Sequence, residues 1–370
     1  MVQDKETILP IQLSFMLYTT VMATGFLVLP ALGSLYAPYD FWMSSILAMI
    51  PGVISIVLAT SLHTRFPGLT IIESGQRIVG KVFGKLIGLL YFIYFLHFTG
   101  VISREYAEFV KGCFLFDTPM MFVSCSLLLL AACAVRGGVN VLAKSAVIFT
   151  VLFMMPLLFL LLLIPDLNWT NILPMLSQGM VPVMKATFVP QSWVSELFLI
   201  TFLLPYVKDQ KKAKQWGYAA LGMIGISMLL IDLVVLLLLG PDTSNKTYPV
   251  LVAFRYMSVG GFFENLEALL LAMWVMGNLV KQSVVLYATV ISFSQSFGIS
   301  DFRSLVFPIA ILAAVFGIWD LPNIAAIQSL IEKISVFEIP LFMIVIPLLL
   351  LLIAWLTGRR GTNQGGVNGR

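Results

Sequence analysis

The chain is a series of long apolar runs separated by short polar segments. The runs span residues 9–36, 41–62, 86–111, 119–135, 143–164, 187–206, 217–239, 262–283, 304–319 and 335–357. About 20 mostly apolar residues are needed for a helix to cross the hydrocarbon core of a bilayer. Strands of a membrane barrel would show shorter segments of alternating hydrophobicity. The pattern therefore predicts an all-α polytopic membrane protein, with ten transmembrane helices in one domain over residues 1–357.

Composition supports a membrane protein and argues against disulfide, metal and histidine-based catalytic sites. Of 370 residues, 59% are hydrophobic and only 11% are charged, which is unlike a soluble domain of this size. Three cysteines (Cys113, Cys125, Cys133) and two histidines (His63, His97) form no disulfide framework, metal pattern or catalytic cluster. We expect a non-enzyme that uses no cofactor, metal or nucleic acid and whose surroundings are the lipid bilayer. The tail at 358–370, rich in Gly and Asn, is expected to be cytoplasmic and disordered.

The positive residues indicate the orientation of the spans, because cytoplasmic loops of membrane proteins carry an excess of Lys and Arg. With the N-terminus inside, the inner positions hold Lys5, Arg65, Arg77, Lys81, Lys85, Arg136, Lys144, Lys208, Lys211, Lys212, Lys214, Lys281, Arg303, Arg359, Arg360 and Arg370. The outer positions hold only Lys111, Lys185, Lys246, Arg255 and Lys333, with Arg104 in or near the third run. This bias predicts that both termini are cytoplasmic.

One inner loop carries a pattern of its own. Residues 63–85 are amphipathic and basic, which predicts a helix on the cytoplasmic surface. Gly80, Gly84 and Gly88, at its end and just beyond it, lie four residues apart, a spacing that lets another helix approach closely.

Two runs contain helix-breaking residues in their middle. The first has Gly25 and Pro30 after a Thr-rich stretch, and the sixth has Pro190 and Pro205 around Glu196. Broken helices in matching positions of two inverted halves, here about 10–164 and 187–357, typically hold a substrate near the bilayer centre. A simple kink is the alternative for each.

Ionisable residues within the runs are candidates for function, because they are costly in a membrane. One helical face of the third run holds Tyr94, His97, Val101, Glu105 and Glu108. One face of the eighth run holds Glu267, Leu271, Trp274, Asn278 and Lys281, and Glu264 lies one turn before Glu267. An ion or proton path would use Tyr94, Glu105, Glu196, Glu267 and Lys281. Ion pairing of Glu105 or Glu108 with Arg104 or Lys111 is the structural alternative, and Asp232 is interpreted as a lone contact between helices.

Several segments resemble the B subunit of GerA-type spore germinant receptors (the GerAB/GerKB family) in the amino acid–polyamine–organocation transporter superfamily. The resemblance covers about residues 5–357. It includes Ile11-Gln12, Gly25, Pro30, Glu196, Phe202, Pro205, the segment Thr247-Tyr248-Pro249-Val250-Leu251, the segment from Gly260 to Ala268, and Trp274.

The resemblance implies a LeuT-like bundle of two inverted five-helix repeats with helices 1 and 6 broken. It also implies a sensor of small germinants, commonly amino acids, in the spore inner membrane, acting beside an A-type membrane subunit and a C-type lipoprotein. The implied ligand-binding residues are Met22, Ala23, Thr24, Gly25, His97, Phe98, Val101, Trp193, Ser195 and Leu199. Residues 193–196 lack a glycine that many amino acid permeases have at this break. A proton- or sodium-coupled amino acid transporter, an ion or water channel component and an assembly scaffold are the alternative functions.

Overall fold

The computed structural model describes residues 7–257 and 266–361, and helices account for all of the regular elements in this part. Nine helical segments there are long and apolar enough to cross a membrane, and Met120–Arg136 is a shorter apolar helix. Together these ten segments correspond to the ten predicted runs, so the predicted number of spans is confirmed. Predictions about Lys5, Glu264, Arg370 and the segments 258–265 and 362–370 fall outside the described residues.

The first five spans come from the N-terminal half of the chain. In order they are α1 (Pro10–Ser34); α2 (Phe41–Leu47) with α3 (Met49–Arg65); α5 (Lys81–Cys113); α6 (Met120–Arg136); and α7 (Val139–Phe159) with the 3₁₀ segment η1 (Leu160–Asp166). The short helix α4 (Ile71–Val79) lies between the second and third spans, within the predicted amphipathic segment. The 3₁₀ turn η2 (Trp169–Ile172) follows the fifth span.

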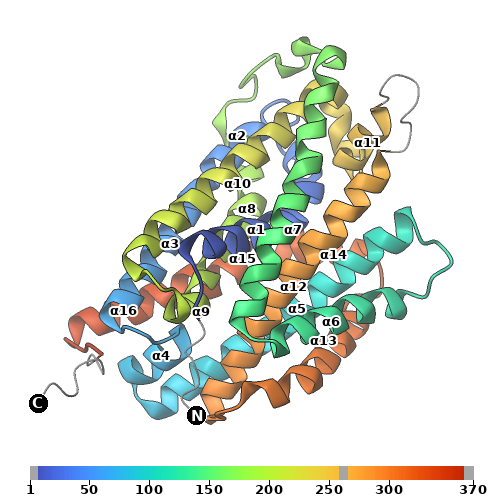
Figure 1. Cartoon of the computed structure of the whole chain (residues 1–370). Helices are drawn as coiled ribbons and strands as arrows, with labels where there is room; N and C mark the ends of the chain where they lie inside the picture. Colours follow the sequence, from blue (N-terminus) through green and yellow to red (C-terminus); the bar gives the residue numbers. More distant parts are fainter. Residues whose placement is uncertain (1–6, 258–265, 362–370) are drawn as a thin grey trace, which may run out of the picture.

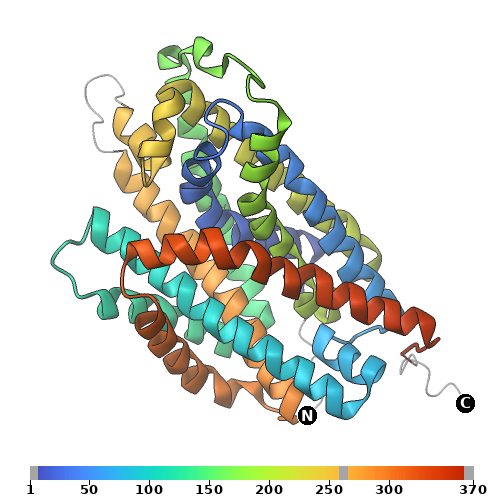
Figure 2. The same ribbon diagram turned by 180° about the vertical axis from the view of Figure 1, so that it is seen from behind.

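The second five spans are more irregular. They are α8 (Met180–Ser195), η3 (Glu196–Leu199), α9 (Ile200–Leu203) and η4 (Leu204–Tyr206) as one span; α10 (Gln210–Leu239); α12 (Glu267–Phe297); α13 (Val306–Asp320); and α14 (Ile324–Leu330) to α16 (Ile346–Leu356). The last span also contains α15 (Val336–Pro340) and two π-helical turns, η7 (Ile331–Ser335) and η8 (Leu341–Val345). Figure 2 shows this span in red, crossing the back of the molecule. Loops hold η5 (Gly240–Asn245), α11 (Pro249–Tyr256) and η6 (Phe302–Leu305).

Several spans are longer than predicted, and two of them by more than ten residues at one end. The eighth span continues to Phe297 instead of 283, and the tenth begins at Ile324 instead of 335. The C-terminal part of α12 contains serines and a threonine, which lower its hydropathy. Ser283, Thr289 and Ser292 donate to carbonyls four residues earlier in their own helix, so they are compatible with a buried helix.

The break predicted in the first span is wrong, because α1 is one uninterrupted helix through Gly25 and Pro30. Nearly all of α1 is buried by protein. A continuous helix satisfies its own backbone groups there, whereas a break would require other partners for them. The sixth span does change at the expected place: α-helix ends at Ser195, and the 3₁₀ turn η3 begins at Glu196.

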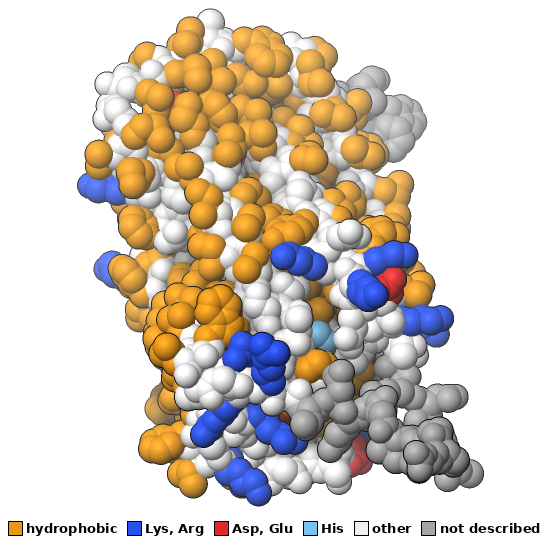
Figure 3. Space-filling view, turned by 90° about the vertical axis from the view of Figure 1, so that its left-hand side faces the viewer, with side chains coloured by type: hydrophobic (Ala, Val, Ile, Leu, Met, Phe, Trp, Pro, Cys, Tyr) orange, Lys and Arg blue, Asp and Glu red, His pale blue; other side chains and the backbone are white. Residues whose placement is uncertain are grey.

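Hydrogen bonds between loops show that successive loops alternate between the two ends of the bundle (Figure 1). At one end, the backbone of Ile8 bonds to that of Tyr206 and Lys208, Arg65 bonds to the Arg359 carbonyl, and Arg303 bonds to the Arg136 carbonyl. At the other end, the Asp40 carboxylate accepts from the Leu176 N–H, and the Leu237 carbonyl accepts from the Asn168 N–H. The loops predicted to be basic therefore share one end, hereafter the basic end. The placement of Lys281 in one of these loops is wrong, because it is buried in the middle of α12. Figure 3 shows Lys and Arg side chains gathered over the lower half of one face.

Glycines allow α5 to pack closely against two neighbours. A Cβ atom on Gly84 would lie 2.3 Å from the Gln76 Cα of α4, which confirms the predicted small-residue face at this position. Farther along, a Cβ atom on Gly100 would lie 2.8 Å from the Gly317 backbone nitrogen of α13, and one on Gly317 would lie 2.5 Å from the Gly100 carbonyl oxygen. The α5–α13 interface is thus a contact of backbone against backbone.

We expect Gly100→Val and Gly317→Val each to destabilise the protein, because a side chain at either position collides with backbone that cannot rotate away. Overpacking of this kind costs about 1–3 kcal/mol. Gly112→Val, in the same helix as Gly100 but with nothing within 4 Å of its Cβ position, is the matched control. Thermal unfolding in detergent should show a lower Tm for the first two variants only. Equal Tm values in all three would contradict the interface.

Candidate functional site

The centre of the bundle is organised around α12, which packs against α1, α5 and α7 (Figure 1). Its middle turns bury polar and charged side chains, including Asn278, Lys281 and Gln282. Burying a charge is unfavourable unless it is paired and hydrogen-bonded. The partners of Lys281 therefore identify the helices that are held together here.

Lys281 forms a buried ion pair with Glu196 of η3. Its Nζ donates to both carboxylate oxygens, at 3.0 Å to Oε1 and 2.9 Å to Oε2, and the two side chains are 1% and 0% exposed. A third bond runs from Nζ to the Thr24 hydroxyl of α1, at 3.0 Å. The three donors of the ammonium group thus have acceptors, and the pair ties α12 to the sixth span and to α1.

Aromatic rings surround this ammonium group. Trp193 Nε1 donates to the same Thr24 hydroxyl at 2.8 Å, and the Lys281 Nζ lies 5.9 Å from the Trp193 ring centroid. The same Nζ lies 5.4 Å from the ring centroid of Phe98 in α5. Cation–π contacts at these distances stabilise a buried ammonium group. We call Thr24, Phe98, Trp193, Glu196 and Lys281 the central cluster.

Other residues predicted for ligand binding lie in the same helices. Met22, Ala23, Val101, Ser195 and Leu199 are buried, and Ser195 donates to the Ser192 carbonyl in its own helix. A Cβ atom on Gly25 would lie 3.3 Å from Trp193 Cδ1, so this glycine gives the indole its space.

Other predicted residues do not join the central cluster. His97 Nε2 lies 2.9 Å from Asp320 Oδ2 of α13, and both side chains are partly exposed. Glu267 pairs with Arg255 of α11, also partly exposed. The Tyr94 ring stacks on Phe342, with ring centroids 4.1 Å apart, and its hydroxyl is buried without a hydrogen-bond partner.

The partners of three further carboxylates test the ion pairs and the interhelical contact that the sequence left open. Glu108 accepts from Arg104 at 2.6 Å, as the ion-pair interpretation predicted. Glu105 is not paired with Arg104: its Oε1 is buried without a partner. Asp232 accepts from Ser45 of α2 at 2.5 Å, which confirms it as a contact between helices.

Sequence reasoning selected Glu196 and Lys281 separately and missed that they pair. A signal was available, because a lone Lys deep in an apolar helix needs an anionic partner. Sequence reasoning also missed the bond from Gln282 Nε2 to the Thr99 carbonyl, at 3.0 Å, and the contact of Thr99 with Thr289, at 3.0 Å. These bonds join α12 to α5 beside the cluster.

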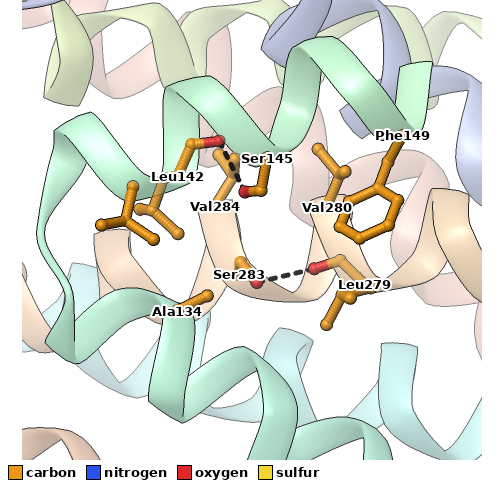
Figure 4. Close-up of a pocket in the computed structure, with 9 residues that line it drawn as sticks. Ala134, Leu142, Ser145, Phe149, Leu279, Val280, Ser283 and Val284 are labelled. Carbon is orange, nitrogen blue, oxygen red and sulfur yellow. Dashed lines mark hydrogen bonds between the residues drawn. The ribbon is translucent and has the colours of Figure 1, made fainter. Parts of the chain in front are cut away.

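A small cavity between α6, α7 and α12 is not a candidate site (Figure 4). It measures about 60 Å³ and has mainly apolar walls. Its two hydroxyls, on Ser145 and Ser283, already donate to carbonyls in their own helices. The cavity is a gap in helix packing.

Solved structures with a similar arrangement of helices include a transporter. The chain is similar to MHP1, a nucleobase-cation-symport-1 family transporter in a closed conformation with bromovinylhydantoin bound, with a TM-score of 0.69, 13% identity, and coverage of 96% of this chain and 80% of that one. It is also similar to MhsT in complex with L-phenylalanine, with a TM-score of 0.60, 14% identity, and coverage of 93% and 98%. These similarities show the LeuT-type fold that the family resemblance implied.

Relatives in sequence share a role in spores. The chain is 25% identical to spore germination protein KB of Bacillus subtilis (strain 168), over 96% of both chains. It is 26% identical to spore germination protein A2 of the same organism, over 81% of this chain and 83% of that one. The family model described as spore germination protein (spore permease) matches residues 7–325. This multi-pass integral membrane protein therefore belongs to the spore germination protein family.

Proposed function

We propose that this protein is the nutrient-sensing membrane subunit of a spore germinant receptor and binds a small amino acid between α1, α5 and the sixth span. The observation that carries the proposal is the central cluster, in which a buried ammonium and a buried carboxylate face each other among aromatic rings. Membership of the spore germination family supports the role in germination. We also propose that the protein lies in the inner membrane of the spore, with both termini at the basic end and on the cytoplasmic side.

The chemistry of the cluster favours a zwitterion. When the Glu196–Lys281 pair opens, an amino acid supplies an ammonium group to Glu196 and a carboxylate to Lys281, so neither buried charge loses its partner. A ligand with a single charge would leave one of them unpaired, which is strongly unfavourable in this surrounding. Phe98 and Trp193 would then enclose the ligand, while Val101 and Leu199 would limit the size of its side chain. One methylene group in such a pocket is worth about 1–3 kcal/mol.

Sensing requires that the ligand binds one state of the bundle better than another, because equal affinity for both shifts no equilibrium. In the state described here, the ion pair is closed and Trp193 is held by Thr24. Ligand binding would replace the internal partners and stabilise a second state with a different η3. An A-type membrane subunit and a C-type lipoprotein are the proposed recipients of that change.

The second candidate function is coupled transport by the same site. Its support is the similarity in fold to MHP1, a nucleobase-cation-symport-1 family transporter. Lys281 and Glu196 would then be candidates for coupling the movement of an ion to that of the ligand.

Glu196→Gln should destabilise the protein by about 3–5 kcal/mol, because it leaves the Lys281 ammonium buried without a counter-charge. Adding Lys281→Met should recover most of the loss while abolishing amino acid binding. Thermal unfolding and equilibrium binding of labelled amino acids in nanodiscs measure the two effects. Removing the exposed pair with Asp209→Asn and Lys212→Met is the control, and its effect should stay within about 1 kcal/mol. A double variant that still binds amino acids would disprove the zwitterion site.

Thr24→Val should shift the germination dose-response to higher nutrient concentration, since both Lys281 and Trp193 lose an acceptor. Each buried donor left unsatisfied costs about 1–3 kcal/mol. Thr60→Val is the matched control, because the Thr60 hydroxyl donates only to carbonyls of its own helix. Spores carrying each variant, at equal protein level, give the comparison. Identical dose-response curves would remove Thr24 from the site.

Uptake separates the two candidate functions. Purified protein in sealed proteoliposomes should bind labelled amino acids without accumulating them, with or without a proton or sodium gradient. Accumulation that collapses together with the gradient would establish transport instead.

A further inference from the structure

A second cavity lies at the end of the bundle opposite the basic end, and it measures about 240 Å³. Val28, Ala31 and Leu32 of α1 form one wall together with Leu35, which directly follows that helix, and residues of α14 and η7 form another. The loop Ser244–Tyr248 lies over a third side, and Glu105 of α5 also lines the cavity. The cavity does not include any residue of the central cluster.

Glu105 is the unusual group in this wall. The residue is only 8% exposed, and its Oε1 has no hydrogen-bond partner. The neighbouring Arg104 is already bonded to Glu108 and to the Pro322 carbonyl. A buried carboxylate oxygen without a donor costs free energy, so a ligand that brings a donor into the cavity gains what the protein lacks.

The other charges of the cavity favour a cation. Glu332 adds a second carboxylate to its wall. Among the described lining residues Lys246 is the one cation, and its Nζ is paired with Asp242 at 2.7 Å. The polar atoms thus favour a positive ligand, while the isoleucines and leucines of α1, α14 and η7 favour an alkyl group. The small volume limits the ligand to a few carbon atoms, because typical ligand pockets are larger.

We propose that this cavity is a separate binding site for small organic ammonium compounds, which donate to Glu105 and place their alkyl part against α1 and α14. The site would bind amines from that side of the membrane whether or not the central cluster binds an amino acid. The proposal therefore does not depend on the proposed function.

The test uses n-butylamine, which is n-butylammonium at neutral pH, with the full-length protein in nanodiscs. Binding is measured by isothermal titration calorimetry and by the rise in Tm. The wild type should bind n-butylammonium, and Glu105→Gln should weaken that binding at least tenfold. Without ligand, Glu105→Gln should be as stable as the wild type or more so, because an amide costs less to bury than a carboxylate whose Oε1 lacks a donor. Asp117→Asn, an exposed carboxylate in the loop after α5, should leave binding unchanged.

Further arms distinguish the possible outcomes. Thr24→Val should leave n-butylammonium binding intact, which separates this cavity from the central cluster. Equal binding by wild type and Glu105→Gln would overturn the proposal. So would binding of n-butanol as tight as that of n-butylammonium, or full competition by sodium at equal concentration, which would identify a site for inorganic cations.

Discussion

The buried pair of Glu196 and Lys281 is the interaction on which the arrangement of the core depends. Two charges out of water must stay together, because separating them in the interior costs far more than at the surface. Their positions, 85 residues apart in sequence, fix the turn η3 against the middle of α12. Thr24 adds α1 to the same contact. These contacts therefore align α12, the sixth span and α1 at one level of the membrane.

Close packing around the pair makes this alignment specific. Gly25 leaves space for the Trp193 indole, and Gly277 of α12 faces Ala23 and Phe153 with no space for a side chain. Interiors of this density do not deform continuously, so a change at the centre moves whole helices between alternative packings. A charged pair inside such a core acts as a switch only if a replacement partner arrives, because opening it alone is too costly.

The number of spans, the basic end and the change at Glu196 could be predicted from the sequence, since hydropathy and charge bias are local properties. The ends of α12 could not, because serines that bond to their own helix look polar in a hydropathy profile. The break at Gly25 was also wrong, since helix-breaking residues lower propensity but burial decides the outcome. Periodicity placed Lys281 and Glu105 on helical faces without saying which faces meet. That is why the ion pair and the cavity beside Glu105 were not predicted.

The short bridge at the basic end has a mechanical consequence. Ile8 donates to the Tyr206 carbonyl and accepts from the Lys208 N–H, so the start of α1 is fastened to the end of the sixth span. Only a few residues separate this fastening from the turn that carries Glu196. A displacement of that turn must carry Ile8 along or break both backbone bonds. Movement of the buried charges is thereby coupled to the surface of the bundle at the basic end.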